Sequence, residues 1–408
     1  MKLGYWKTWR EIRKASSKKE GIFLYGRSED WVHKAISSLP ETNLLGIVDR
    51  NRDHHGSTYL DLKIGQFEEI ENPKNYFFLI TAGEFDGILD VLSKSGLTAG
   101  IDYACSPDFR DLRFIKEFTN IHVSAVIACS DYNDFTRARS SRMGGGLYKF
   151  DSSTKKIEKK AKGSYRQLQL VEGSVYAVEY VEGAIDQFDR DLNFVERYYL
   201  PGTNLCGIAY NEHRDCFYVS NAATDAILEV RLDTNDTAVL KHFMKKGMKR
   251  EAHINDLCFH DGKLFVSYFS KSGNYKYGVF DGGVSVIDID LKLEPQEIIN
   301  GLWKPHSPSI FDGQFYVLDS MRGNLLSGKP NSQLQFPGFV RGLDKKKNIW
   351  AIGQSQDMYI SEHIGSGRTI SIDPGVYLCD NESHIQRFYP LPSIMNIHDI
   401  KITDVYTT

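Results

Sequence analysis

Residues 253–267 read HINDLCFHDGKLFVS and contain the pattern that decides the fold. Three polar residues, His253, Asn255 and Asp256, come first, and Asp261-Gly262 then separates a short strand from a second alternating run. An Asp-Gly pair between two alternating runs is a strong signal for a tight β-hairpin. We therefore predict a hairpin whose first strand starts with polar side chains.

The same pattern recurs along the chain. It returns in residues 204–220 (NLCGIAYNEHRDCFYVS), 306–319 (HSPSIFDGQFYVLD) and 341–353 (RGLDKKKNIWAIG). Strand–turn–strand units fill consecutive segments of roughly 35 to 50 residues each, which is the length of a propeller blade. These segments are Arg166–Leu200, Leu205–Lys245, Ile254–Asn300, His306–Gly338 and Val340–Leu391.

The remaining strands predict one further blade, built from both ends of this region. Its outer strands are Val123–Cys129, Gly146–Asp151 and Lys156–Lys162, and its innermost strand is Ile397–Ile402. Such closure removes the free sheet edges that invite aggregation. A β-sandwich is the alternative, but the regular repeat argues against it. We predict that residues 121–408 form a six-bladed β-propeller closed by the C-terminal strand.

Composition places the chain among ordinary soluble proteins. Its hydrophobic share is 41%, its charged share is 25%, and its net charge of −3 gives no sign of nucleic-acid binding. No apolar run approaches the length of a membrane span, and the N-terminus lacks the apolar region of a signal peptide. We therefore expect a cytoplasmic protein whose six scattered cysteines stay reduced.

Residues 1–20 have helical spacing. Trp6, Trp9 and Ile12 are three residues apart, and Lys and Arg lie between them. Such a basic amphipathic helix could lie on a membrane surface or contact a partner. The alternative is a helix that docks on the next domain and keeps its charges in water.

Residues 21–120 predict a different fold class. Apolar strands at 21–26, 44–49 and 76–83 alternate with helical stretches at 29–39 and 85–95. This order is typical of βαβ units and a parallel sheet. We predict a small Rossmann-like α/β domain, so that the whole chain combines an α/β and an all-β domain.

A nucleotide site in this domain would lie at its first turn. Gly26, Arg27 and Ser28 stand where a dinucleotide fold has its glycine-rich loop, but two of the glycines of that motif are missing. Asp49 ends the second strand, where a ribose-binding acid would stand. The alternative is that Asp49 caps a turn. Nucleotide binding requires open backbone N–H groups at the start of the following helix.

This segment resembles the truncated Rossmann-like domains of sugar-modifying proteins in bacterial polysaccharide pathways. The resemblance covers most of residues 21–110 and is carried by Gly46–Asp49, Leu79–Gly83, Leu92–Gly96 and Gly100–Tyr103. It implies that the domain either binds a nucleotide-sugar or serves as a structural module.

Polar residues begin the innermost strand of every predicted blade. Because these starts open on one face of a propeller, we expect a ligand site there, which we call the axial mouth. Long loops at residues 131–144, 268–281 and 355–374 frame it, with Arg137, Arg139, Arg142, Tyr275, Tyr277, Glu362, His363 and Arg368. The strand starts are Arg166, Asn204, His253, Asn255, Asp256, His306, Arg341, His398 and Asp399.

Two kinds of chemistry fit these residues. A divalent cation could be held by Asn255, Asp256, Asp319 and Asp399. Oxygen ligands alone would favour calcium, whereas an added histidine imidazole would favour zinc or manganese. Alternatively His253, His306 or His398 acts as base, and Arg341 stabilises an oxyanion. The alternative to a functional site is that the polar residues on the propeller axis bind only ordered water, and that Asp and Asn at the strand starts cap turns.

Two further resemblances concern the propeller. The first is to the gluconolactonase and regucalcin-like propellers, whose strand starts are similar to Asn255-Asp256 and His398-Asp399. This resemblance implies that Asn255 and Asp399 are metal ligands. The Glu-Gly-Pro motif that would supply the glutamate ligand of that family is absent from this sequence. The second resemblance covers residues 200–402 and is to a functionally uncharacterised bacterial propeller family. It is carried by His306-Ser-Pro and by residues 312–320 and 336–343. That resemblance implies a shared site at His306, Asp319 and Arg341.

Two functions follow as hypotheses. The first is an enzyme that acts on a sugar or nucleotide-sugar in bacterial surface polysaccharide biosynthesis, as an isomerase, lyase or hydrolase. The second is a non-catalytic scaffold or ligand-binding propeller that docks to a partner enzyme or a membrane surface. Neither hypothesis involves nucleic acid.

Overall fold

The computed structural model describes residues 4–40, 42–130, 144–243, 252–291, 294–356 and 373–407. The chain divides into two compact units between Ile121 and His122, one residue from the predicted boundary. Arg137, Arg139, Arg142, Glu362, His363 and Arg368, predicted to frame the axial mouth, lie outside the described residues. Within the described ranges, no helix combines the length and hydrophobicity that crossing a bilayer requires.

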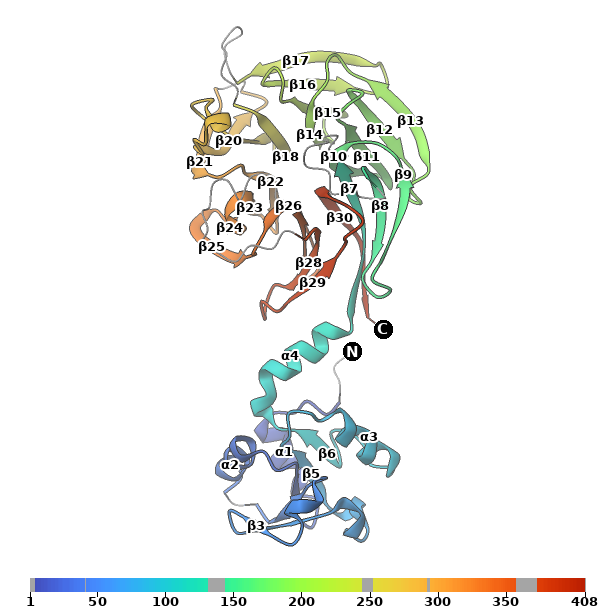
Figure 1. The fold of residues 1–408 in the computed structure, drawn as a ribbon, viewed down its shortest axis with the longest axis vertical. Helices are drawn as coiled ribbons and strands as arrows, with labels where there is room; N and C mark the ends of the chain where they lie inside the picture. Colours follow the sequence, from blue (N-terminus) through green and yellow to red (C-terminus); the bar gives the residue numbers. More distant parts are fainter. Residues whose placement is uncertain are drawn as a thin grey trace. The chain divides into compact units, whose positions relative to one another are not determined.

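The N-terminal unit contains one sheet with strand order β3-β4-β2-β1-β5-β6 (Figure 1). The pairs from β4 to β6 are parallel, whereas β3 and β4 form an antiparallel hairpin. This mixed sheet with few helices is an α/β arrangement that fits a Rossmann-like domain only loosely. Its elements are α1 (Trp9–Ser16), β1 (Ile22–Tyr25), α2 (Glu29–Ser38), β2 (Leu44–Val48), β3 (Thr58–Tyr59), β4 (Leu62–Gly65), β5 (Phe77–Ile80), α3 (Asp86–Lys94), β6 (Tyr103–Cys105) and α4 (Arg110–Thr119).

The first helix packs inside this unit. Thr8 and Glu11 form a capping box, in which each side chain accepts a hydrogen bond from the other residue's backbone N–H. Ile12 is fully buried and belongs to one apolar cluster with Ile22, Leu24 and Val32. The apolar face of α1 is therefore covered by its own unit, as in the docked alternative.

The second unit is the predicted six-bladed propeller. Each blade is a four-stranded sheet, and β30 pairs with β7 to complete the last one (Figure 1). The blades are β10 (Tyr165–Val171) with β11 (Ser174–Glu179), β12 (Ala184–Phe188) and β13 (Phe194–Tyr199); β14 (Leu205–Asn211) with β15 (Cys216–Asn221), β16 (Ala226–Arg231) and β17 (Asp236–His242); β18 (Ile254–His260) with β19 (Lys263–Tyr268), β20 (Gly282–Asp288) and β21 (Gln296–Leu302); β22 (His306–Phe311) with β23 (Gln314–Asp319), β24 (Asn324–Ser327) and β25 (Lys329–Gln335); β26 (Phe339–Lys346) with β27 (Ile349–Ser355), β28 (Gly375–Asp380) and β29 (Gln386–Pro390); and β30 (Asn396–Thr407) with β7 (Ile121–Ser130), β8 (Gly146–Asp151) and β9 (Lys156–Ala161).

The innermost strands share one irregularity near their starts. In β10, β14, β18, β22 and β26, the pairing with the second strand shifts by one residue, as in a β-bulge. A bulge leaves backbone groups without ladder partners, so other groups must satisfy them. The bulges fall at Arg166-Gln167, Cys206-Gly207, Asn255-Asp256, Ser307-Pro308 and Gly342.

Ser220 and Ser267 bond the Gly207 and Asp256 N–H groups within their own blades, and buried side chains of other blades bond N–H groups at or just after the bulges. Gln167 accepts from the N–H groups of Ile208 and Leu257, both at 2.9 Å, and donates to the Leu257 carbonyl at 2.7 Å. Gln167 on β10 therefore ties together the innermost strands of the next two blades.

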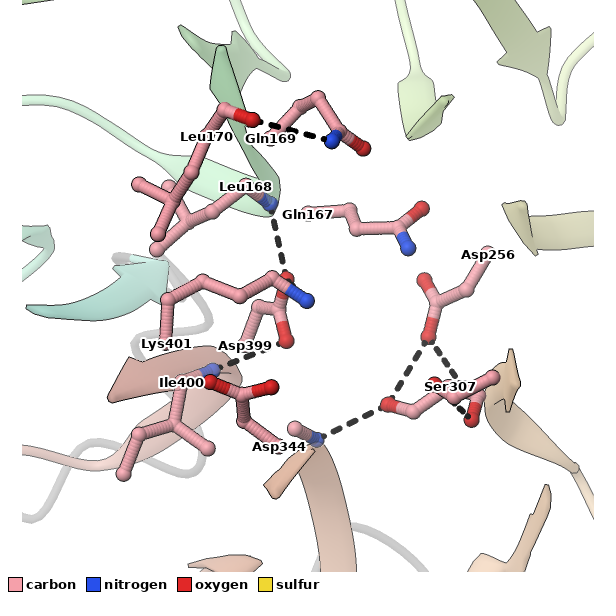
Figure 2. Close-up of polar contacts among 12 residues, drawn as sticks. Gln167, Leu168, Gln169, Leu170, Asp256, Ser307, Asp344, Asp399, Ile400 and Lys401 are labelled. Carbon is pink, nitrogen blue, oxygen red and sulfur yellow. Dashed lines mark hydrogen bonds and ion pairs between the residues drawn. The ribbon is translucent and has the colours of Figure 1, made fainter. Parts of the chain in front are cut away.

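The other blades are tied in the same way (Figure 2). Asp256 Oδ2 accepts from the Ser307 N–H at 2.7 Å, and Ser307 Oγ accepts from the Gly342 N–H at 3.1 Å. Asp344 Oδ2 accepts from the Ile402 N–H at 2.6 Å, and Asp399 Oδ2 accepts from the Leu168 N–H at 2.9 Å. Together with Gln167, these bonds form a closed ring through β10, β18, β22, β26 and β30, and Gln167 joins β14 to it; we call this network the axial ring.

We predict that Gln167→Ala destabilises the propeller strongly. It would leave two buried N–H groups and one carbonyl without partners, at about 1–3 kcal/mol each. Urea unfolding should show a loss of about 3 kcal/mol or more. Gln169→Ala is the matched control, because Gln169 bonds only to the neighbouring Leu170 carbonyl and is partly exposed. Equal stability of the two variants would contradict the ring.

Candidate functional site: the axial mouth

Two arginines from different blades meet at one histidine in the axial mouth. Arg341 Nη1 on β26 lies 2.9 Å from His398 Nε2 on β30, and Arg166 Nη1 on β10 also contacts this nitrogen. Ser130 Oγ, at the end of β7, lies 2.8 Å from the same atom. Both guanidinium groups also lie near Nδ1, Arg166 at 3.0 Å and Arg341 at 3.3 Å, and because guanidinium can only donate, the ring nitrogen that they bond is an acceptor.

The histidine in this cluster is neutral. Burial lowers the pKa of His398 well below its ordinary value, and the charges of Arg166 and Arg341 lower it further. The two guanidinium groups keep their charges at all relevant pH values. Two positive charges are thus concentrated around an uncharged imidazole, and no carboxylate in the described ranges forms an ion pair with Arg166.

His306 offers a nitrogen with a fixed protonation state. Its Nδ1 lies 2.9 Å from the Lys304 carbonyl oxygen and 2.8 Å from Ser320 Oγ. Because a carbonyl only accepts, Nδ1 carries the proton and Nε2 carries a lone pair. The side chain is 1% exposed, and Nε2 has no hydrogen-bond partner among the described residues. Burial lowers the pKa of His306 well below its ordinary value, and nearby Arg341 lowers it further.

Aromatic rings connect these groups. Phe269 stacks on His253 with centroids 4.5 Å apart and meets His306 edge-on at 5.1 Å. Phe339 lies 5.8 Å from His306, and the Arg341 guanidinium lies over its ring at 4.8 Å. His253 Nδ1 is 3.2 Å from the Tyr275 hydroxyl. The structure therefore brings together the four residues predicted as catalytic, His253, His306, His398 and Arg341.

Two residues of the site were not singled out from the sequence. Tyr180 lies under the Arg166 guanidinium, 4.0 Å from the ring centroid, and Phe269 separates two histidines. Both directly follow the second strand of their blade, β11 or β19. The axial mouth was predicted from polar strand starts and from loop residues, and an aromatic residue directly after a second strand is the signal that would have found both.

The predicted metal ligands have other partners. Asp256 and Asp399 belong to the axial ring, and Asp399 Oδ2 also lies 3.4 Å from Lys401 Nζ (Figure 2). Asp319 accepts from the Trp303 N–H at 2.8 Å and pairs with Arg322 at 3.1 Å. In the described part of the chain, no three His, Cys, Asp or Glu residues are grouped to hold a metal ion. Asp256, Asp319 and Asp399 each accept a hydrogen bond from a backbone N–H, and a calcium, zinc or manganese site at Asn255, Asp256, Asp319 and Asp399 stays a prediction.

The turn predicted to bind a nucleotide is largely occupied by its own side chains. Asp49 Oδ2 accepts from the Arg27 N–H at 2.6 Å, and its Oδ1 accepts from the Asn51 N–H at 2.7 Å. Gly26 has φ +103°, and a Cβ there would lie 2.3 Å from that of Ala82, so the neighbouring loop explains this glycine. Ser28 caps α2 without a side-chain hydrogen bond. Asp49 thus caps a turn, and it already accepts the hydrogen bond of an N–H group that a phosphate would need.

The fold and site define a six-bladed propeller with a cationic, histidine-containing axial mouth. The model of a family described as "Domain of unknown function (DUF4915)" matches residues 196–371. No curated protein matches the chain. The chain is similar to a solved structure titled "Crystal structure of Nidogen/Laminin Complex", with 11% identity, 68% of this chain and 98% of that chain covered, and a TM-score of 0.49. The resemblance to gluconolactonase propellers is not confirmed.

We predict that Asp256→Asn changes how stability depends on pH. Burial raises the pKa of Asp256 to about 7, and the charge of Asp399 contributes. Between the unfolded pKa of about 3.9 and the folded value, the folded wild type holds a proton that the unfolded chain has lost. Its stability therefore falls as pH rises from about 4 to about 7, by at most about 1.4 kcal/mol per pH unit. The variant retains an acceptor for the Ser307 N–H but lacks this titration.

Urea unfolding at several pH values tests this prediction. The stability of Asp256→Asn relative to wild type should increase between pH 5 and pH 8. Asp261→Asn, in the exposed turn after β18, is the control and should show no such trend. A constant difference for Asp256→Asn would show that this carboxyl keeps its charge in the folded protein.

Proposed function

We propose that this protein is an enzyme that acts on a sugar or nucleotide-sugar carrying an anionic group, and that the axial mouth is its active site. The observation that carries the proposal is the buried Nε2 lone pair of His306 in a site that also contains the Arg166 and Arg341 guanidinium groups. The resemblance of residues 21–110 to domains of polysaccharide pathways supports bacterial surface polysaccharide biosynthesis, in the cytoplasm, as the context.

The arginines suit a carboxylate or phosphate. Guanidinium groups bind such anions through two parallel hydrogen bonds, which fix orientation as well as provide energy. Arg341 is only 5% exposed, so an anion that reaches it leaves most of its water behind. Electrostatic attraction is stronger in this setting than at an open surface.

His306 suits the role of general base. Its Nδ1 hydrogen bond to the Lys304 carbonyl orients the ring, and its neutral state leaves Nε2 able to accept a proton. The arginines lower the pKa of the free histidine, but a bound anion would offset their charge and raise that pKa. Proton acceptance would therefore depend on substrate binding.

Removal of a proton from the carbon next to a sugar carboxylate fits these groups. The C–H electron pair would move into the carboxylate, and the resulting enediolate charge would be stabilised by Arg341 and Arg166. Protonation at the opposite face by solvent, with release of the His306 proton to solvent, gives isomerisation, and departure of a group with its bonding electrons from the next carbon gives elimination. Both reactions belong to the predicted isomerase and lyase classes.

A non-catalytic ligand-binding propeller is the second candidate. The same arginines, which lie over the ring faces of Tyr180 and Phe339, would bind an anionic ligand without any proton transfer. For the N-terminal unit, the role of structural module is favoured, because Asp49 already binds the Arg27 N–H.

We predict that the axial mouth binds acidic sugars in preference to neutral ones. Calorimetry with glucuronate, glucose 1-phosphate and glucose should show binding of at least one anionic sugar and no binding of glucose. Arg341→Lys should weaken this binding by about 10-fold or more through loss of bidentate hydrogen bonding. Arg231→Lys, on the exposed end of β16, is the control and should bind normally.

The His306→Ala variant separates catalysis from binding. We expect it to bind the acidic sugar within about threefold of wild type, because it keeps both arginines, and to lose proton exchange at the carbon next to the carboxylate. Exchange is measured by NMR in deuterated water. Equal exchange in the two proteins would exclude His306 as base, and binding without exchange in wild type would favour the ligand-binding candidate.

A further inference from the structure

A cavity lies in the propeller at the opposite ends of the strands that begin at the axial mouth. It has a volume of about 390 Å³ and is formed between the blade of β10–β13 and the blade of β14–β17. The turns after β10, β14 and β16 and the outer strands β12 and β13 contribute its walls. Its lining is Val171, Glu172, Ser174, Tyr176, Gln187, Tyr198, Tyr210, Asp215, Phe217, Leu232 and Asp233.

Aromatic rings form much of this cavity. The Phe217 ring is 4.8 Å from that of Tyr176 and 5.0 Å from that of Tyr210. Phe217 is buried at 4% exposure, whereas Tyr176, Tyr198 and Tyr210 are partly exposed. Buried Phe217 thus anchors two tyrosines, Tyr176 and Tyr210, that still have exposed surface for a ligand.

The charged side chains that line this cavity are all negative. Glu172, Asp215 and Asp233 are exposed carboxylates, and no lysine or arginine is among the described residues that line the cavity. Burial raises the pKa of Tyr176, and the negative charges of Asp215 and Glu172 contribute. Both carboxylates therefore lie near enough to the Tyr176 hydroxyl to act on it electrostatically.

We infer that this cavity binds an organic cation of the guanidinium type. A guanidinium group stacks on aromatic faces and forms bidentate hydrogen bonds with carboxylates, and this lining combines both kinds of partner. Asp215 Oδ1 accepts from the Tyr210 hydroxyl at 2.8 Å, so the carboxylate is held beside the rings. The inference does not depend on the proposed function of the axial mouth.

Methylguanidinium and methylurea form a matched pair of probes, because they have nearly the same shape and differ in charge. Ligand-observed NMR on the full chain should show methylguanidinium binding and at least 10-fold weaker methylurea binding. Equal binding of the two probes, or no binding of methylguanidinium, would overturn the inference. Binding of glucose in preference to methylguanidinium would also overturn it, since that result indicates a carbohydrate site.

Two variants locate the binding. Asp215→Asn removes a charge but keeps an acceptor for Tyr210, and asparagine tolerates the left-handed backbone (φ 46°) at this position. It should weaken methylguanidinium binding about 5-fold or more, as should Tyr176→Leu, which removes a ring face. Asp236→Asn, an exposed carboxylate on β17 outside the lining, is the control and should bind like wild type. Equal effects of Asp215→Asn and Asp236→Asn would overturn the assignment to this cavity.

An arginine-containing peptide distinguishes the two sources of such a cation. If the peptide binds at least 10-fold more tightly than methylguanidinium and loses this advantage in Asp215→Asn, the ligand is an arginine side chain of a protein partner. If both bind equally and both are weakened by the variant, the ligand is a small molecule. Peptide binding that Asp215→Asn leaves unchanged would overturn the inference.

Discussion

The propeller depends on the axial ring of hydrogen bonds. The innermost strand of each blade is a sheet edge, so some of its backbone N–H groups have no ladder partner, and each unsatisfied buried group would cost about 1–3 kcal/mol. Gln167, Asp256, Ser307, Asp344 and Asp399 meet this need, each for a strand of another blade. The burial of these carboxyl groups is itself unfavourable, as the raised pKa of Asp256 shows. Closure of the propeller outweighs this cost.

The axial ring also positions the axial mouth. Along β10, β26 and β30 the mouth residue and the ring residue are adjacent: Arg166 precedes Gln167, Arg341 precedes Gly342, and His398 precedes Asp399. Gly342 has φ +72°, and a Cβ there would lie 2.8 Å from the Asp399 backbone, so the blades pack closely at this level. Because each functional side chain is one residue from a tied backbone, the site is held by rigid strands rather than loops.

The sequence predicts local structure better than long-range partners. Alternation and Asp-Gly turns involve residues a few positions apart, so the blades and the closing strand could be predicted. The gathering of His253, His306, His398 and Arg341 followed from the fold. The role of Asp399 could not be predicted, because its partner, the Leu168 N–H, is distant in the sequence. A strand-start carboxylate that binds a metal and one that binds a backbone N–H have the same local pattern, and Asp49 and Asp319 illustrate the same ambiguity.

The two proposed sites have opposite charge and can act independently. Arg166 stands near the start of β10, and Val171 at its end lines the anionic cavity. A strand of this length spans about 20 Å at roughly 3.3 Å per residue. The Debye length at physiological ionic strength is about 8 Å, and the carboxylates of the cavity are exposed, so solvent screens much of their interaction with charges in the axial mouth. An anion in the axial mouth would therefore change the affinity of the cavity for a cation very little, unless binding also moved the strands that the axial ring holds in place.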